Sequence, residues 1–355
     1  MSKPILGAIL SCAGKKLTDE EKYIFSSANP LGIALFSRNI ESKKQVKKLV
    51  EEIKNVINRD DVLIAIDAEG GRVNRLNTIS KQLYVSAETL GKSPVEYCKI
   101  HAELISAEMR ELGLNVNFAP IVETKETQQS QVLEGRCFNE DIDKIIKYAK
   151  KMADTYINSG ICPCIKHLPG HFDMMTDPHL QAAVIDISKE EIKEKISYLK
   201  EFNQYPLAMT SHITLKQVDN TFPVSMSKKC ITSILRNYLE FDNMLISDAI
   251  DMHALKGSIA ERAEKCWNAG LDVICYCSGK TNDLRILCQK GRFMNEKSLI
   301  RFDKIKKIIH NTPEPINKLK LKQKYNKKFI AQKNTLYQYD ATEVLNKMLE
   351  QGENI

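Results

Sequence analysis

The chain has 355 residues, with 52 Lys and Arg against 45 Asp and Glu, so its formal net charge is +7. Hydrophobic residues make up 43% and charged residues 27%, which excludes a disordered chain because enough apolar material is present to build a core. With 15 Gly and 11 Pro, collagen-like and low-complexity classes are excluded as well.

The N-terminal segment favours a first strand over a targeting segment. The apolar run Ile5–Leu10 is followed at once by Gly14, Lys15 and Lys16, where a signal peptide would continue its apolar region. No apolar run reaches the roughly 20 residues that cross a bilayer. We therefore expect a cytoplasmic protein without a membrane span.

Eight short β-type runs recur between helical stretches, and each is apolar almost throughout, as expected for strands buried on both faces. They are Ile5–Leu10, Gly32–Phe36, Leu63–Asp67, Asn115–Pro120, Ile161–Lys166, Leu207–Ser211, Met244–Asp248 and Asp272–Cys277.

Helix-period segments separate these strands, and the clearest places five apolar side chains on one stripe of residues 42–57. The predicted helices are Ser42–Ile57, Pro94–Leu112, Ile142–Asn158, Lys189–Phe202, Lys228–Leu239 and Ser258–Ala269, the last ended by Gly270. Strands alternating with helices predict an α/β fold, a (β/α)8 barrel of the TIM type in a single domain. A doubly wound open sheet is the alternative, but neither GxGxxG nor GxxxxGK[ST] is present.

The character of the chain changes after Thr312. Lys318–Lys333 holds seven Lys and no acidic residue. We predict a barrel domain over residues 1–312 and a basic C-terminal extension over 313–355, ending in a helix near Ala341–Gln351. A nucleic-acid or membrane-surface patch is one interpretation. A solvated face is favoured, because the only aromatic residues among these lysines are Tyr325 and Phe329, so no nucleic-acid partner is expected.

Ten cysteines do not make a disulfide framework in a chain of this length. The only close pairs, Cys162 with Cys164 and Cys275 with Cys277, lie inside apolar runs. Reduced cysteines used as small core side chains are therefore favoured over zinc or redox chemistry.

Polar side chains stand where the predicted strands end. Asp67, Lys166–His167, Ser211–His212 and Asp248 each close an apolar run. In a barrel the carboxyl ends of the strands meet on one face, where active sites are built. Four strands ending in this way indicate a site on that face.

The first motif is the segment from Asp67 to Arg75, in which two carboxylates and two Arg flank Gly70-Gly71. The glycines allow a tight turn. A carboxylate here can accept two sugar hydroxyl groups while an Arg holds it in place. A structural ion pair at a turn is an equal alternative.

The second motif holds three His and two Asp within residues 167–179. A metal site is the obvious interpretation, but the segment follows a strand and has no helical spacing to align ligands. The alternative is a proton-transfer dyad of Asp177 and His179, which alternate around Pro178, since a carboxylate beside an imidazole sets its tautomer.

The third motif is Ser247-Asp248-Ala249-Ile250-Asp251. A carboxylate at a barrel mouth can act as a nucleophile toward an electrophilic carbon. The alternative is the N-cap of a following helix, formed by Asp248 or by Asp251.

Together these motifs resemble the family 3 glycoside hydrolases, specifically the small single-domain bacterial β-N-acetylglucosaminidases of cell-wall recycling. The resemblance covers the chain to about Lys290. In family order it rests on Asp67-x-Glu69-Gly-Gly-Arg72-Val-x-Arg75, Asn117-Phe-Ala-Pro120, Lys166-His-x-Pro-Gly-His171, Asp177-x-His179, Ser247-Asp248 and Ala269-Gly-x-Asp272.

The resemblance implies a role for each matched position. Asp248 matches the nucleophile, and His179 matches the acid/base with Asp177 as its partner. The residues that match contacts to the N-acetylglucosamine unit are Asp67, Arg75, Arg136, Lys166 and His167. The implied substrate is a muropeptide or its disaccharide, with no cofactor and no metal, and the implied state is a monomer or homodimer.

Other functions stay open at this level. A phosphorylase would use phosphate in place of water on the same fold. A non-catalytic sugar sensor would have lost Asp248 or His179, and a metal-dependent hydrolase would use the His cluster.

The chain departs from the family pattern at four positions. Pro178 stands between the dyad residues, Phe172 follows His171, Ala249 follows Asp248, and Glu123 replaces an Asp. Both matched catalytic groups are present, so the departures bear on the mobility of the loop more than on its chemistry.

Overall fold

The computed structural model describes residues 3–124, 133–172 and 183–330. Its main sheet is entirely parallel and follows the order β7-β6-β3-β2-β1-β13-β12-β10-β8. The strands are β1 Leu6–Leu10, β2 Pro30–Leu35, β3 Leu63–Ile66, β6 Val116–Asn117, β7 Cys162–Pro163, β8 Ile165–Leu168, β10 Leu207–Thr210, β12 Met244–Ala249 and β13 Val273–Cys275.

The two ends of this order belong to one stretch of chain. β7 and β8 are separated only by Cys164, and β7 pairs with β6 while β8 pairs with β10. The ring therefore closes through residues 162–168, and the eight predicted strands form a barrel in chain order. The (β/α)8 prediction is confirmed, and the open doubly wound sheet is excluded.

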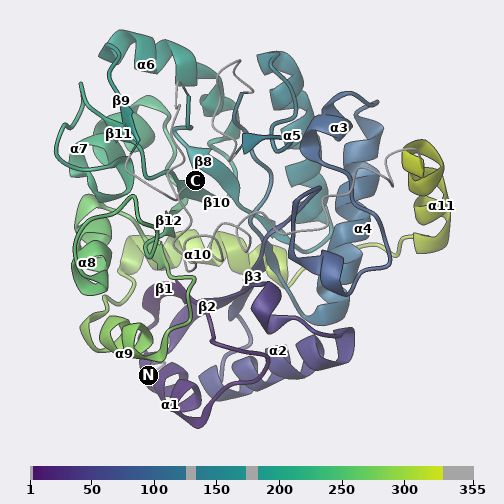
Figure 1. The fold of residues 1–355 in the computed structure, drawn as a ribbon, viewed down its shortest axis with the longest axis horizontal. Helices are drawn as coiled ribbons and strands as arrows, with labels where there is room; N and C mark the ends of the chain where they lie inside the picture. Colours follow the sequence, from purple (N-terminus) through teal and green to yellow (C-terminus); the bar gives the residue numbers. More distant parts are fainter. Residues whose placement is uncertain (1–2, 125–132, 173–182, 331–355) are drawn as a thin grey trace, which may run out of the picture.

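Helices surround the barrel (Figure 1). They are α1 Asp19–Ala28, α2 Lys43–Ile57, α3 Ala87–Gly91, α4 Glu96–Leu112, α5 Ile142–Asn158, α6 Lys189–Ile196, α7 Lys228–Cys230, α8 Ile259–Ala269, α9 Thr281–Lys290, α10 Glu296–Ile309 and α11 Lys318–Phe329. Short pairs β4 Ala68–Gly70 with β5 Val73–Asn74, and β9 Val184–Ile185 with β11 Thr214–Leu215, lie outside the barrel sheet.

The predicted helices are present, and two of them change geometry along their length. Ser42 caps α2. The left-handed Gly270 (φ 107°) ends α8, as the sequence indicates. Residues 189–202 form α6 followed by a 3₁₀ turn, and residues 228–239 form α7 followed by a π-helix.

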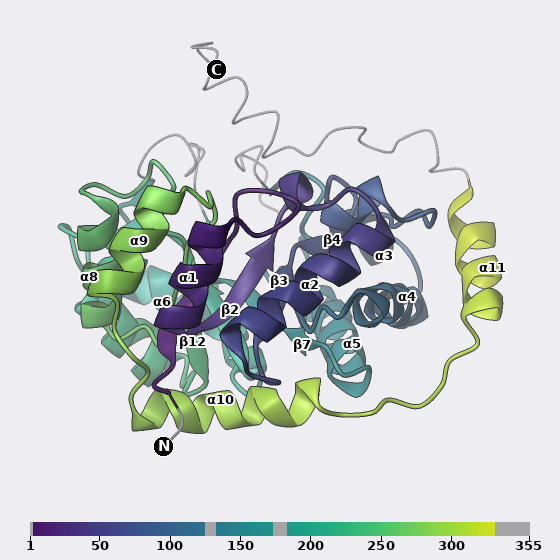
Figure 2. The ribbon, with the colours of Figure 1, turned by 90° about the horizontal axis from the view of Figure 1, so that it is seen from below.

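Two apolar layers hold the barrel. One lies between the outward faces of the strands and the helices, and the other fills the barrel interior. The interior layer takes alternate residues of each strand because side chains alternate across a strand. Helix α10 adds Phe302 and Ile305 to this interior layer. It crosses the end of the barrel from which the β2 arrow points away (Figure 2), so it covers the amino ends of the strands.

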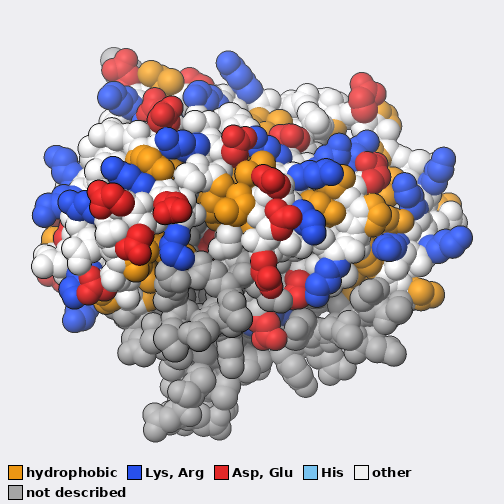
Figure 3. Space-filling model, turned by 90° about the horizontal axis from the view of Figure 1, so that it is seen from above, with side chains coloured by type: hydrophobic (Ala, Val, Ile, Leu, Met, Phe, Trp, Pro, Cys, Tyr) orange, Lys and Arg blue, Asp and Glu red, His pale blue; other side chains and the backbone are white. Residues whose placement is uncertain are grey.

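One face of the molecule is mixed in charge, and the cysteines are free thiols. On the face drawn in Figure 3, basic and acidic side chains are interspersed. All ten cysteines are free thiols, and all but Cys277 and Cys288 are buried. In the described part of the chain, none of the helices combines the length and apolar character of a membrane span.

Candidate active site

The site follows from the alternation of the barrel strands. Three of the inward-facing rows run Leu63-Ala65, Cys162-Cys164 and Met244-Ile246. Continued by two residues toward the carboxyl end, these rows reach Asp67, Lys166 and Asp248. All three line a cavity of about 760 Å³ at this end of the barrel, together with Arg75, Arg136, His167 and His171. The described residues predicted from the sequence to form the site therefore meet in one cavity.

An ion-pair network forms one wall of the cavity. The Lys166 Nζ atom lies 2.8 Å from Asp67 Oδ1 and 2.6 Å from Glu69 Oε1. Arg136 donates two hydrogen bonds to Glu69, from Nε at 3.0 Å and from Nη2 at 2.8 Å. Arg75 lies 3.8 Å from Asp67 Oδ2. Glu69 thus holds two of the cations that line the cavity, Arg136 and Lys166.

Glu69 and Lys166 are both charged at neutral pH. Burial alone would raise the pKa of Glu69, but Arg136 and Lys166 outweigh burial and hold that pKa at about 2. Burial would lower the pKa of Lys166, but Asp67 and Glu69 outweigh it and raise that pKa. The wall therefore offers a carboxylate and two cations in fixed positions, a set suited to the hydroxyl and carbonyl groups of a sugar.

A second network joins Glu123 to two histidines. The Glu123 carboxylate accepts hydrogen bonds from His167 Nδ1 at 2.7 Å and from His171 Nδ1 at 3.0 Å. It also accepts the backbone N–H groups of both histidines. Because Glu123 occupies Nδ1 of His167, the ring directs Nε2 into the cavity, 3.8 Å from Asp248 Oδ2.

The pKa values of the two histidines shift in opposite directions although the two rings share one carboxylate. Burial lowers the pKa of His167 in spite of Glu123, so this ring is neutral at neutral pH and Nε2 carries a lone pair. For His171, burial would lower the pKa, but Glu123 outweighs it and raises that pKa. The pKa of Glu123 lies well below its usual value: burial opposes this, and His171 and His167 outweigh it. His167 is therefore an acceptor for a hydroxyl group beside Asp248.

Asp248 stands at the carboxyl end of β12 with its side chain 20% exposed. Its Oδ1 accepts the backbone N–H of Ala249 at 2.7 Å. The helix-cap alternative is wrong for the following helix, because Ser258 caps α8. Asp251 instead accepts the backbone N–H of Cys277. Asp248 is thus a partly solvated carboxylate at the cavity, as a nucleophile requires.

Among the described residues, one His and carboxylate group has the spacing of a metal site. Ligand atoms of Glu123, His167 and His171 lie within 4.8 Å of one another. In that arrangement both Nδ1 atoms donate protons to the carboxylate, whereas a metal takes the lone pair of an imidazole nitrogen. The hydrogen-bond network accounts for the cluster, and absence of a metal stays a prediction.

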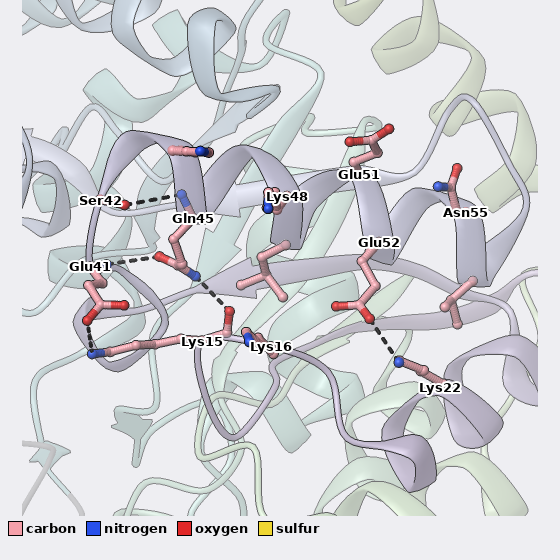
Figure 4. Close-up of a pocket in the computed structure, with 13 residues that line it drawn as sticks. Lys15, Lys16, Lys22, Glu41, Ser42, Gln45, Lys48, Glu51, Glu52 and Asn55 are labelled. Atoms are coloured by element: carbon pink, nitrogen blue, oxygen red, sulfur yellow. Dashed lines mark hydrogen bonds and ion pairs between the residues drawn. The ribbon is translucent and has the colours of Figure 1, made fainter.

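A second hollow, of about 790 Å³, lies along α2 near α1 and the loop that precedes it. It is open, and long charged side chains line it (Figure 4). Lys15 pairs with Glu41 at 3.2 Å and Lys22 with Glu52 at 2.9 Å. These pairs are solvent-exposed, so the hollow lacks the buried, convergent polar groups of a catalytic site.

Two site residues predicted from the sequence, Asp177 and His179, lie outside the described residues and stay predictions. The sequence interpretation missed that Glu69 binds both Arg136 and Lys166. It also missed that Glu123 binds both His167 and His171. It also missed Arg38, which lines the cavity and donates to the carbonyl groups of Cys12 and Cys277. The Asp67-x-Glu69 motif is the feature of the sequence that could have indicated Glu69.

The family model described as the glycosyl hydrolase family 3 N terminal domain matches residues 6–308. The chain belongs to glycosyl hydrolase family 3. The resemblance inferred from the motifs is confirmed, and by family the chain is a glycoside hydrolase.

Relatives of this family 3 chain carry the name β-hexosaminidase. That of Haemophilus influenzae (strain ATCC 51907 / DSM 11121 / KW20 / Rd) is 29% identical over 289 residues, which cover 79% of this chain and 81% of the relative. That of Actinobacillus pleuropneumoniae serotype 3 is 29% identical over 290 residues, covering 79% and 83%.

Solved structures share the fold. NagZ from Neisseria gonorrhoeae in complex with N-trifluoroacetyl-D-glucosamine has a TM-score of 0.79 at 22% identity, covering 91% of this chain and 97% of that one. A family 3 β-N-acetylglucosaminidase from Paenibacillus sp. str. FPU-7 has a TM-score of 0.77 at 22% identity, covering 91% and 67%.

Proposed function

We propose that this family 3 enzyme is a retaining exo-β-N-acetylglucosaminidase, a β-N-acetylhexosaminidase. Its substrate would be a muropeptide or the derived disaccharide with a terminal β-linked N-acetylglucosamine. The enzyme would cleave this substrate during cell-wall recycling in the cytoplasm. The names of the relatives support the sugar specificity, and so does the sugar analogue named with the gonococcal structure.

One observation carries the proposal: the Asp248 carboxylate faces a cavity whose wall holds Asp67, Lys166 and Arg136. A carboxylate opposite fixed hydrogen-bonding groups can reach the anomeric carbon of a sugar that those groups hold. Asp67 accepts two hydroxyl groups, and Lys166 and Arg136 donate to oxygen atoms. Arg75 and His167 complete the contacts to the sugar.

The proposed reaction is a double displacement. Asp248 attacks the anomeric carbon while His179 protonates the leaving oxygen, and Asp177 orients the imidazole of His179. Water activated by His179 then releases the sugar from Asp248, so the anomeric configuration is retained. Neutral His167, with Nδ1–H held by Glu123, accepts a substrate hydroxyl through Nε2 without adding a charge beside the nucleophile.

An imidazole acid/base has a consequence for the acceptor. A neutral imidazole does not repel an anionic acceptor, as a carboxylate base would. The same site can therefore admit phosphate, so phosphorolysis is the outcome that the acceptor test must separate from hydrolysis.

The test compares 4-nitrophenyl N-acetyl-β-D-glucosaminide with 4-nitrophenyl β-D-glucoside, with and without phosphate. We expect turnover of the first substrate, preference over the glucoside, and free N-acetylglucosamine as product in either buffer. A sugar phosphate formed only with phosphate present would make the enzyme a phosphorylase. Binding of N-acetylglucosamine without turnover of either substrate would make the protein a sugar sensor.

Asp67→Asn provides the matched variant for the sugar wall. It keeps the size of the side chain but removes the charge that pairs with Lys166. We expect the KM for the N-acetylglucosaminide to rise while Asp248 remains in place. An unchanged KM would contradict the assignment of the wall to the sugar.

A further inference from the structure

Helix α11 lies beyond the region matched by the family model, which ends at residue 308. It packs on the outer side of α4, at the edge of the molecule (Figures 1 and 2). Its sequence is dominated by lysine, yet Tyr325 and Phe329 are almost completely buried. Phe329 meets Tyr97 of α4 edge-on, with ring centroids 5.4 Å apart. These two aromatic side chains attach the helix to the barrel.

The Tyr325 hydroxyl joins two separate parts of the chain. Its oxygen accepts the backbone N–H of Val85 at 3.2 Å and lies 2.7 Å from Nδ1 of His101. The other ring nitrogen, Nε2, lies 3.1 Å from the backbone carbonyl oxygen of Glu69.

The Glu69 carbonyl group determines which atoms carry the protons in this chain of hydrogen bonds. A carbonyl oxygen only accepts, so Nε2 of His101 carries the hydrogen and donates it to Glu69. Burial lowers the pKa of His101 to about 4, against the hydrogen bond to Glu69. The ring is therefore neutral, and its Nδ1 lone pair accepts the Tyr325 O–H. Both ring nitrogens of His101 and the hydroxyl group of Tyr325 therefore have hydrogen-bond partners.

His101 also packs under the turn that carries Glu69. Gly70 has a left-handed φ of 102°, and a Cβ atom there would lie 2.7 Å from Cε1 of His101 and 2.3 Å from the carbonyl oxygen of Val85. The next residue, Gly71, donates its N–H to the Tyr84 carbonyl oxygen at 2.9 Å. The two residues that follow the Glu69 carbonyl are thus in contact with His101, Val85 and Tyr84, which all lie next to Tyr325.

We infer that Tyr325 is a positioning residue for the sugar site and acts through His101 on Glu69. The Glu69 side chain holds Arg136 and Lys166, so a shift of its backbone moves these two cavity-lining cations. The C-terminal helix then supports substrate binding although none of its residues lines that cavity. This inference rests on the proposed function for its kinetic readout only.

The experiment compares Tyr325→Phe with Tyr205→Phe. Tyr205 is equally buried and donates its hydroxyl to Asp154 at 2.8 Å, but it precedes β10 at the amino end of the barrel. Each change removes one buried, hydrogen-bonded hydroxyl group, so both variants carry a structural cost. For 4-nitrophenyl N-acetyl-β-D-glucosaminide we expect Tyr325→Phe to raise KM about three- to tenfold, with kcat within about twofold, the size of one lost hydrogen bond. Tyr205→Phe leaves KM unchanged.

Two further measurements separate positioning from packing. Hydrogen–deuterium exchange should rise across residues 68–71 in Tyr325→Phe but not in Tyr205→Phe. His101→Gln keeps one donor and one acceptor, so its KM should stay closer to that of the wild type than the KM of His101→Leu.

Each result has a distinct meaning. Equal loss of stability in both tyrosine variants, with unchanged KM and unchanged exchange at residues 68–71, would make Tyr325 a core residue only and overturn the inference. Absence of turnover by the wild-type enzyme would instead contradict the proposed function. In that case the exchange of residues 68–71 still decides whether Tyr325 orders the Glu69 turn.

Discussion

Replacement of Glu69 by Gln tests the ion-pair network of the sugar wall. Glu69 is 6% exposed and bonds Arg136 and Lys166. Gln has the same size but no charge, so Arg136 loses its bidentate partner and stays buried. The expected result is a loss of folding stability together with weaker substrate binding.

The size of the expected loss of folding stability follows from the pKa of Glu69. Folding lowers the pKa of Glu69 from 4.5 to about 2, a shift of 4.5 − 2, about 2.5 units, which at 1.36 kcal/mol per unit corresponds to about 3 kcal/mol. Removal of one partner from a buried ion pair commonly costs about 3–5 kcal/mol of folding stability, which agrees with this value. Because the folded-state pKa is lowered, this stability is present above pH 4.5 and is lost as the pH falls toward 2.

Urea unfolding provides the assay, followed by the fluorescence of Trp267, the single tryptophan, which is buried. The difference between wild type and Glu69→Gln should be about 3 kcal/mol at pH 7 and fall to about half by pH 3. Glu201→Gln is the control, because Glu201 forms an exposed pair with Lys150 and should change stability little. A loss below about 1 kcal/mol at pH 7, or a difference that does not change with pH, would refute the reasoning.

Four further predictions follow from the site. Asp248→Ala should abolish nearly all turnover with an unchanged circular dichroism spectrum, and activity within tenfold of the wild type, about 1.4 kcal/mol in the barrier, would contradict its role as nucleophile. His179→Ala should cost far more on a natural disaccharide than on a nitrophenyl glycoside and should produce a burst on the latter, with Asp177→Ala acting more mildly; equal losses and no burst would make His171 the next candidate for the acid/base. Excess chelator should leave the rate unchanged, whereas loss of activity restored by zinc would indicate a metallohydrolase. The Glu123 carboxylate outweighs burial and raises the pKa of His171, and Glu123→Gln removes this negative charge, so urea unfolding should show a larger stability loss at pH 5.5 than at pH 8; a loss that grows with pH would contradict the raised pKa of His171.

The sequence by itself determined the barrel and the location of the site. Apolar runs of four to six residues alternate with helical periods, and each run that ends in a polar side chain places it at the carboxyl end of a strand. Because side chains alternate, Asp67, Lys166 and Asp248 follow the inward rows of their strands, and their convergence in one cavity required only that the barrel close.

Only the tertiary structure decided the partners of these residues. Glu69 meets Arg136 across 67 positions of sequence, and Glu123 meets His171 across 48. No local periodicity encodes such pairs, because they depend on how neighbouring strands and loops are staggered. The same holds for α11, where Tyr325 and Phe329 look like two aromatic residues in a solvated lysine-rich helix. Their burial against α4, and the contact of Tyr325 with His101 224 positions away, exist only because the C-terminal segment folds back onto the outer side of α4.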